Sequence, residues 1–131
     1  MKIEPVFLTF SDIIEIHNYQ IENFGGASGV RDIALLKSAI GMPSATFGGV
    51  FLHSTIYEMA AAYLYHLVEN HPFVDGNKRV GAMAALVFLD INGLEFGASD
   101  EDFTDVVMHV ASGKMLKAEI TLFLKQHSIK R

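Results

Sequence analysis

The sequence lacks several residue types whose absence limits what the protein can be. Its 131 residues include no cysteine, no tryptophan and only three prolines. Without cysteine, disulfide frameworks, zinc fingers, iron–sulfur sites and thiol catalysis are excluded, and this lack is in keeping with a reducing cytoplasm. A chain of this length buries enough surface to form one core without such staples. We therefore expect one domain over residues 1–131.

Positive charge is also scarce. The chain has 10 Lys and Arg against 15 Asp and Glu, a formal net charge of −5. A domain that binds nucleic acid mainly through phosphates carries the opposite balance. We expect no direct nucleic-acid partner, and any anion site must be local.

Long apolar runs are missing as well. The longest, residues 59–65 and 80–89, are well short of the ~20 residues that a membrane-spanning helix needs. The N-terminal segment carries Glu4 and Pro5 and has no apolar run followed by a small-residue cleavage site, so it does not read as a signal peptide. We expect a cytoplasmic protein without a membrane partner.

Apolar residues recur every three and four positions, which predicts helices over residues 10–23, 31–40, 54–70, 77–92, 99–112 and 116–126. Thr9 with Asp12 forms a capping-box-like start for the first helix, and Ser99 is an N-cap for the fifth. Residues 43–54 place glycines among β-prone residues and predict a flap or small hairpin. Residues 6–8 are expected to be extended. The fold class is therefore all-α: a single-domain bundle of about six helices with a short flap before the central helix pair.

The helices over residues 54–70 and 77–92 are the most apolar, and a short connector joins them. Such a connector favours antiparallel packing. Small residues on the later helix would then face Ala60, Ala61 and Ala62 on the earlier one, namely Gly81, Ala82, Ala84 and Ala85. This pair is expected to form the core.

The chemically specific residues are concentrated in that connector, HPFVDGNKRVG, residues 71–81. Lys78 and Arg79 lie in the first turn of a helix, where the dipole disfavours each cation by up to ~1 kcal/mol, so an anion is expected there. Gly76 lets the backbone approach a ligand closely, and Asn77 either caps the helix or donates its amide. With the free N–H groups of the first turn they form an anion nest, and two adjacent cations favour a polyphosphate.

Two further residues of the connector suggest a reaction. Asp75 would repel the anion unless a cation intervenes, and one carboxylate plus phosphate oxygens is a common way to hold Mg²⁺. His71 precedes the nest, and an imidazole with a pKa near ~6.5 can take a proton from an attacking hydroxyl. Pro72 and Phe73 would make the loop rigid, with Phe73 as its buried anchor. The expected ligand is a metal–nucleotide.

These residues resemble the signature of the Fic/Doc superfamily: histidine, proline, phenylalanine, an acidic residue, then glycine–asparagine and arginine. Residues 26–49 resemble the upstream region of death-on-curing (Doc-type) toxins. The resemblance implies that the loop binds Mg²⁺ and ATP, that the histidine activates a hydroxyl of a target protein, and that the flap docks the target segment as an added strand. Carried over by position, the catalytic residues are His71, Asp75, Lys78 and Arg79, the nucleotide contacts are Gly76, Asn77, Lys78 and Arg79, and the metal ligand is Asp75.

Two positions separate the subfamilies. The commoner AMP-transferring pattern has glycine and a second arginine where this chain has Lys78 and Ala82, and both differences resemble Doc-type members. That resemblance implies transfer of the terminal phosphate of ATP to a Ser or Thr hydroxyl, with an elongation factor Tu-like target. The inhibitory motif that Fic proteins carry in cis is not matched, because Ser54 and Glu58 are followed by Met59. The resemblance therefore implies a cognate antitoxin protein as a partner.

Other interpretations remain open from the sequence. AMP transfer to a protein hydroxyl is the nearest, and a nucleotide- or partner-binding module without turnover is another. Lys78 taken alone has a second, less favoured interpretation as a solvated surface lysine, and the flap has one as an ordinary hairpin that covers the core. The remaining histidines lack a regular metal-ligand spacing and are expected to be structural or surface residues: His17, His53, His66, His109 and His127.

Overall fold

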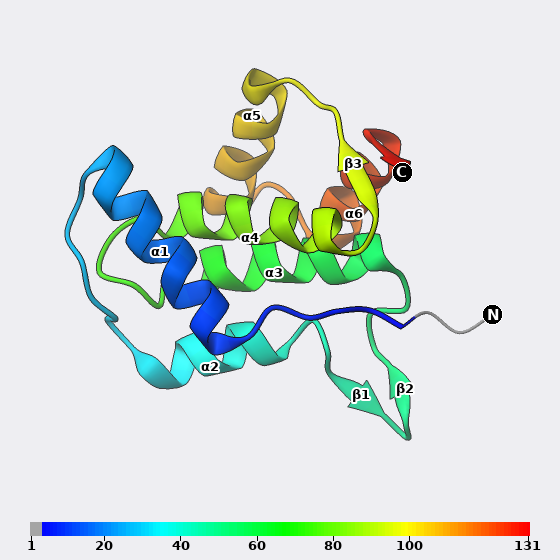
Figure 1. Cartoon of the computed structure of the whole chain (residues 1–131), viewed down its shortest axis with the longest axis horizontal. Helices are drawn as coiled ribbons and strands as arrows, with labels where there is room; N and C mark the ends of the chain where they lie inside the picture. Colours follow the sequence, from blue (N-terminus) through cyan, green and yellow to red (C-terminus); the bar gives the residue numbers. More distant parts are fainter. Residues whose placement is uncertain (1–3) are drawn as a thin grey trace.

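The chain folds as a helical domain around a central helix pair, in a computed structural model that describes residues 4–131 (Figure 1). Its elements in chain order are α1 (Phe10–Phe24), α2 (Ile33–Gly41), β1 (Thr46–Phe47), β2 (Val50–Phe51), α3 (Ile56–Asn70), α4 (Asn77–Ile91), β3 (Leu94–Phe96), α5 (Asp100–Ala111), α6 (Lys117–Gln126) and β4 (Ser128–Lys130). In Figure 1, α3 and α4 lie side by side through the middle, with α1, α2, α5 and α6 around them. The expected all-α bundle of about six helices with a hairpin before the central pair is confirmed.

Side-chain caps set where the helices begin. The capping box of α1 is present, since Thr9 Oγ1 accepts from Asp12 N (3.1 Å) and Asp12 Oδ2 accepts from Thr9 N (2.8 Å). Ser99 caps α5 as predicted, accepting from Asp102 N at 3.1 Å. Two starts were predicted two residues too early. Asp32 caps α2 and Thr55 caps α3, so these helices begin at Ile33 and Ile56 rather than at residues 31 and 54.

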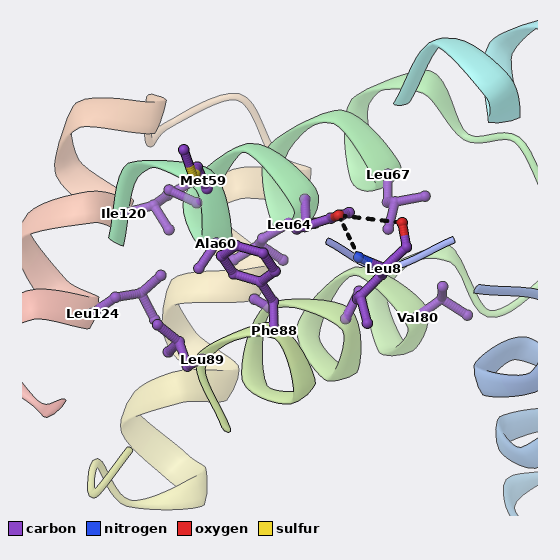
Figure 2. Packing of buried hydrophobic residues seen from close by; sticks show 14 of the residues in the cluster. Leu8, Met59, Ala60, Leu64, Leu67, Val80, Phe88, Leu89, Ile120 and Leu124 are labelled. Atoms are coloured by element: carbon purple, nitrogen blue, oxygen red, sulfur yellow. Dashed lines mark hydrogen bonds between the residues drawn. The ribbon is translucent and has the colours of Figure 1, made fainter. Parts of the chain in front are cut away.

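The core lies between α3 and α4 and extends under α5 and α6 (Figure 2). Small residues let the two central helices approach closely, as predicted. A Cβ on Gly81 would lie 3.1 Å from Val68 Cγ2 and 3.2 Å from the carbonyl oxygen of Leu64. The neighbours of Gly81 are thus Leu64 and Val68, one to two turns further along α3 than the predicted alanines.

The segment before α1 is held by side chains. The hydroxyl of Tyr63 accepts from Leu8 N (2.9 Å), a contact drawn in Figure 2, and the side-chain oxygen of Asn92 accepts from Val6 N (2.8 Å). Burial raises the pKa of Tyr63 to about 12. Residues 6–8, predicted to be an extended entry, belong to no strand, and side chains bond the backbone groups of Val6 and Leu8.

Two short antiparallel sheets complete the fold. β1 and β2 form the predicted hairpin, turning at Gly48 and Gly49, whose positive φ angles favour glycine. The hairpin projects from the helices (Figure 1), and the side chain of Phe47 is 81% exposed, so its tip does not cover the core. The second sheet was not predicted: β3 pairs with β4 and fastens the C-terminal residues beside the end of α4. None of the helices between residues 4 and 131 is both long and apolar enough to cross a bilayer.

Candidate active site

The connector between α3 and α4 is anchored by an aromatic stack. Phe73 is fully buried, as predicted for the anchor of the loop. The ring of His17, from α1, stacks on it with centroids 3.9 Å apart and planes 7° apart, and His17 Nε2 donates to the carbonyl oxygen of Asp75 (2.9 Å). His17 is structural, as expected, but its contact with the loop was not predicted.

His71 lies at the point where α3 ends. It is the C-cap of that helix, with φ 48° and ψ 52°, and within residues 4–131 no other non-glycine residue has a positive φ. The left-handed conformation costs a non-glycine residue on the order of 1 kcal/mol or more, so surrounding contacts must hold it. It turns the chain sharply and leaves the His71 side chain exposed beside the start of α4.

Asn77 braces the loop from inside. It is 7% exposed; its Oδ1 accepts from Phe73 N (2.9 Å) and its Nδ2 donates to Phe73 O (3.0 Å). The cap of α4 is Gly76, so of the two roles predicted for Asn77 the structure has the amide donor. Because the Asn77 side chain is already bonded inside the protein, its contact with a nucleotide would have to come from its backbone N–H.

The same amide determines which nitrogen of His71 carries hydrogen. Both bonds to Phe73 fix the orientation of the Asn77 amide, so its Nδ2 faces His71 Nδ1, 2.5 Å away. Since Nδ2 only donates, Nδ1 must accept, and the neutral ring then carries its hydrogen on Nε2. In this arrangement the exposed nitrogen of His71 is a hydrogen-bond donor.

Asp75 is exposed, and backbone donors hold its carboxylate. Its Oδ2 accepts from Ala27 N (3.2 Å) and its Oδ1 accepts from Gly76 N (2.8 Å). These two bonds lower the pKa of Asp75, with a smaller contribution from the charge of Arg79. A Cβ on Gly26 would lie 2.6 Å from Asp75 Oδ2, and Gly26 has a φ of +110°, so glycine favours this close approach. The carboxylate is ionised at neutral pH and retains lone pairs for a cation.

The start of α4 offers unneutralised positive charge. Val80 N donates to Gly76 O (2.9 Å), which leaves the N–H groups of residues 77–79 unused by the helix. Lys78 and Arg79 are exposed, and the ion pair found within residues 4–131 joins Arg131 and Asp90 instead. The guanidinium of Arg79 lies 5.5 Å from the ring centre of Phe24, a residue of α1 that the sequence did not single out.

Two hollows flank this loop. One, of about 340 Å³, lies on the Arg79 side and is lined by Phe24, Gly25, Gly26, Asp75, Gly76, Asn77, Lys78 and Arg79. The other, of about 220 Å³, is lined by Val68, His71, Asp75, Gly76, Asn77, Lys78 and Ala111. The structure therefore brings the predicted site residues together on two faces of one short loop, with His71 on one face and Arg79 on the other.

A metal ion at this loop would depend on its ligand. Among the described residues there is no group of three or more His, Asp or Glu side chains that could hold a metal by itself. Asp75 supplies one ionised carboxylate, and Mg²⁺ is commonly bound by one or two carboxylates together with substrate phosphates. The donor set fits a magnesium ion that arrives with a polyphosphate.

Two other histidines gather away from the loop. His53 Nε2 and His66 Nε2 lie 3.2 Å and 3.0 Å from Lys117 Nζ at the start of α6. Burial and the charge of Lys117 lower the pKa of His66 to about 4, and the same causes lower the pKa of His53. Through Lys117 they join α3, α6 and the segment after β2.

Known proteins resemble this chain over most of its length. The profile of the Fic/DOC family matches residues 7–89. Toxin Doc of Mycolicibacterium smegmatis is 44% identical over 87 residues, which cover 66% of this chain and 67% of that protein. Protein kinase doc of Escherichia phage P1 is 28% identical over 115 residues, covering 88% of this chain and 90% of that one.

Proposed function

The chain belongs to the Fic/DOC family, and from that premise we propose that it is a Doc-type toxin acting in the cytoplasm. It transfers the terminal phosphate of ATP to a Ser or Thr hydroxyl of a translation factor similar to elongation factor Tu. The names of two relatives, Toxin Doc and Protein kinase doc, support a toxin and a kinase. The observation that carries the proposal is that Asp75, Gly76, Asn77 and Lys78 line both hollows.

The residues that line both hollows support a nucleotide orientation in which the terminal phosphate faces His71. Phosphates on the Arg79 side meet the unused N–H groups at the start of α4, and helix N-termini of this kind bind anions. Lys78 lines both hollows, so a phosphate chain that follows it ends on the His71 side. Its terminal phosphate then lies next to the hollow that the acceptor hydroxyl enters.

Magnesium would be held by Asp75 together with phosphate oxygens. The carboxylate is fixed by the N–H groups of Ala27 and Gly76 and remains ionised, which suits a hard cation. When bound, the ion neutralises charge on the phosphates. Lys78 and Arg79 add to this neutralisation, and phosphoryl transfer is catalysed mainly by positioning and charge.

His71 is the base of the proposed reaction. The hydroxyl oxygen of the acceptor attacks the terminal phosphorus, the bond to the bridging oxygen breaks, and the hydroxyl proton passes to Nε2. Because Nε2 carries the hydrogen while Nδ1 accepts from Asn77, the ring must first exchange to the tautomer with hydrogen on Nδ1. The Asn77 contact is then lost, and it reforms after the reaction, when the doubly protonated ring releases the hydrogen on Nδ1 to solvent.

The partner that restrains the toxin is proposed to be a cognate antitoxin with a basic, amphipathic segment. A hollow of about 490 Å³ between α1 and α4 offers apolar Ile16, Met83 and Val87 beside acidic Glu15. Gln20 lines this hollow and is 3% exposed, and its Nε2 has no hydrogen-bond partner within the described residues. Such a surface suits a segment that brings apolar groups, a cation and a carbonyl oxygen.

One incubation tests the catalytic proposal. The purified protein is mixed with Mg²⁺, ATP and elongation factor Tu, and mass spectrometry reads the group added to the target. One phosphate supports the proposal, and one nucleoside monophosphate would replace it with AMP transfer. His71→Ala should abolish the added mass and the growth inhibition, whereas Lys37→Ala, an exposed position on α2, should leave both. Undiminished toxicity of the His71 variant would favour a binding module.

Binding of the antitoxin is tested separately. Glu15→Lys and Met83→Arg place positive charge in the hollow between α1 and α4, and both should weaken antitoxin binding measured by calorimetry. Neither residue lines the hollows at the loop, so phosphate transfer should persist. Full affinity in both variants would place the antitoxin elsewhere.

A further inference from the structure

Arg31 is bonded to the residues that link α3 to the loop, although it lies 40 positions before His71 in the chain. Its Nε donates to the carbonyl oxygen of His71 (2.7 Å) and its Nη2 donates to that of Asn70 (3.0 Å). Its backbone N donates to the carbonyl oxygen of Pro72 (2.7 Å). One residue therefore engages three consecutive carbonyls at the end of α3, where the helix itself supplies no donors.

These contacts surround the strained residue of the site. His71 adopts the left-handed conformation without being glycine, so its backbone must be held by neighbours. The planar guanidinium makes two bonds in a fixed fork, and its positive charge lies at the negative end of the α3 dipole. Both effects favour the same conformation of His71.

The rest of the upstream segment reinforces the same loop. Val30 pairs with Phe73 in an antiparallel bridge, and Val74 N donates to Gly29 O (3.0 Å). Residues 29–32 thus lie along the loop and bond to it. Within this segment, Arg31 is the charged side chain that bonds to the His71 backbone. Arg31 lines neither hollow at the loop, so it is placed to act on His71 and not on a nucleotide.

We propose that Arg31 is a positioning residue for His71: it holds the left-handed turn that points the imidazole at the acceptor hydroxyl. This inference rests on the proposed phosphate transfer for its kinetic consequence. The effect on the conformation of His71 is independent of any activity. Arg31 touches no reacting atom, and its contribution is the direction of the His71 side chain.

The test compares Arg31→Ala and Arg31→Lys with Lys37→Ala, in which another exposed cation of the same region is removed. In Arg31→Ala, kcat should fall by about 100-fold, the order expected for a small misplacement of a catalytic group, while KM for ATP stays unchanged. Millimolar guanidinium should restore part of kcat in Arg31→Ala, whereas ammonium should not. Lysine should restore less than wild-type activity, because one ammonium does not reproduce the fork.

Nuclear magnetic resonance tests the conformation of His71 without any measurement of enzyme activity. The coupling between the amide and α protons of His71 reports φ, and it should leave its left-handed value in Arg31→Ala but not in Lys37→Ala. An unchanged coupling, a wild-type kcat, or a rise in KM for ATP that matches the loss of kcat would overturn the proposal. If the wild-type protein transfers no phosphate at all, the proposed function fails, and the coupling alone decides the role of Arg31. If Arg31→Ala does not fold, kcat and the His71 coupling are measured in Arg31→Lys instead.

Discussion

The cluster of His53, His66 and Lys117 predicts that acid destabilises the protein. The perturbation is a shift from about pH 7.5 to about pH 5. Burial and the Lys117 charge lower the pKa of His66 in the folded protein from 6.5 to about 4. Between these values the unfolded chain binds a proton that the folded protein does not, so the free energy of unfolding falls as the pH falls. The stabilisation is complete above about pH 6.5 and is lost progressively toward pH 4.

The magnitude follows from the shift. Each pKa unit corresponds to about 1.4 kcal/mol, so a group with pKa values of 6.5 and about 4 loses about 2 kcal/mol on going to pH 5. Because His66 is partly exposed, solvent screening reduces this, and we expect about 1 to 2 kcal/mol. The lowered pKa of His53 adds a loss of the same sign, and the charge of Glu58 opposes it.

Urea unfolding at both pH values is the assay, with wild-type protein beside His66→Gln. Glutamine does not titrate, and its side-chain oxygen is an acceptor that can replace the ring nitrogen toward Lys117 Nζ. The variant should therefore lose about 1 to 2 kcal/mol less than wild type on acidification. His109→Gln, at an exposed position on α5, serves as the matched control and should behave as wild type. An identical loss in wild type and His66→Gln would refute the reasoning.

Three further changes probe the loop. Asn77→Ala should lower the free energy of unfolding by about 3 kcal/mol, because it leaves the buried N–H and carbonyl of Phe73 unpaired; a urea midpoint near that of wild type would contradict this. Gly26→Ala should lower the free energy of unfolding by about 1 to 3 kcal/mol, since φ is +110° and the new Cβ would meet Asp75 Oδ2 at 2.6 Å. Calorimetry should also show weaker binding of Mg²⁺ and ATP. An unchanged urea midpoint together with unchanged binding would contradict the contact. Asp75→Asn removes the charge and leaves Ala27 N or Gly76 N facing an amide group, so calorimetry should find that ATP binding no longer depends on magnesium; a preserved dependence would place the metal on other groups.

Local patterns along the chain determined much of this protein. The helices, the hairpin at Gly48 and Gly49, and the caps at Thr9 and Ser99 depend on interactions between residues three or four apart, and those spacings are visible in the amino-acid sequence itself. The loop from His71 to Arg79 was equally visible, because its residue types and order are short-range features. Residue 54 was misplaced as a helix start because Ser54 and Thr55 are both N-cap residues by type, and only their backbone angles decide between them. Residue 31 lies outside α2 because Arg31 bonds to the carbonyls at the end of α3.

Tertiary structure decided which distant residues support that loop. The stack of His17 on Phe73, the bonds from Arg31 and the ring of Phe24 beneath Arg79 join segments dozens of positions apart. No periodicity records such contacts, since they arise only when α1 and the segment before α2 pack against the central helices. The pairing of β3 with β4 has the same origin: each strand has three residues, and only the folded chain brings their hydrogen-bonding groups together.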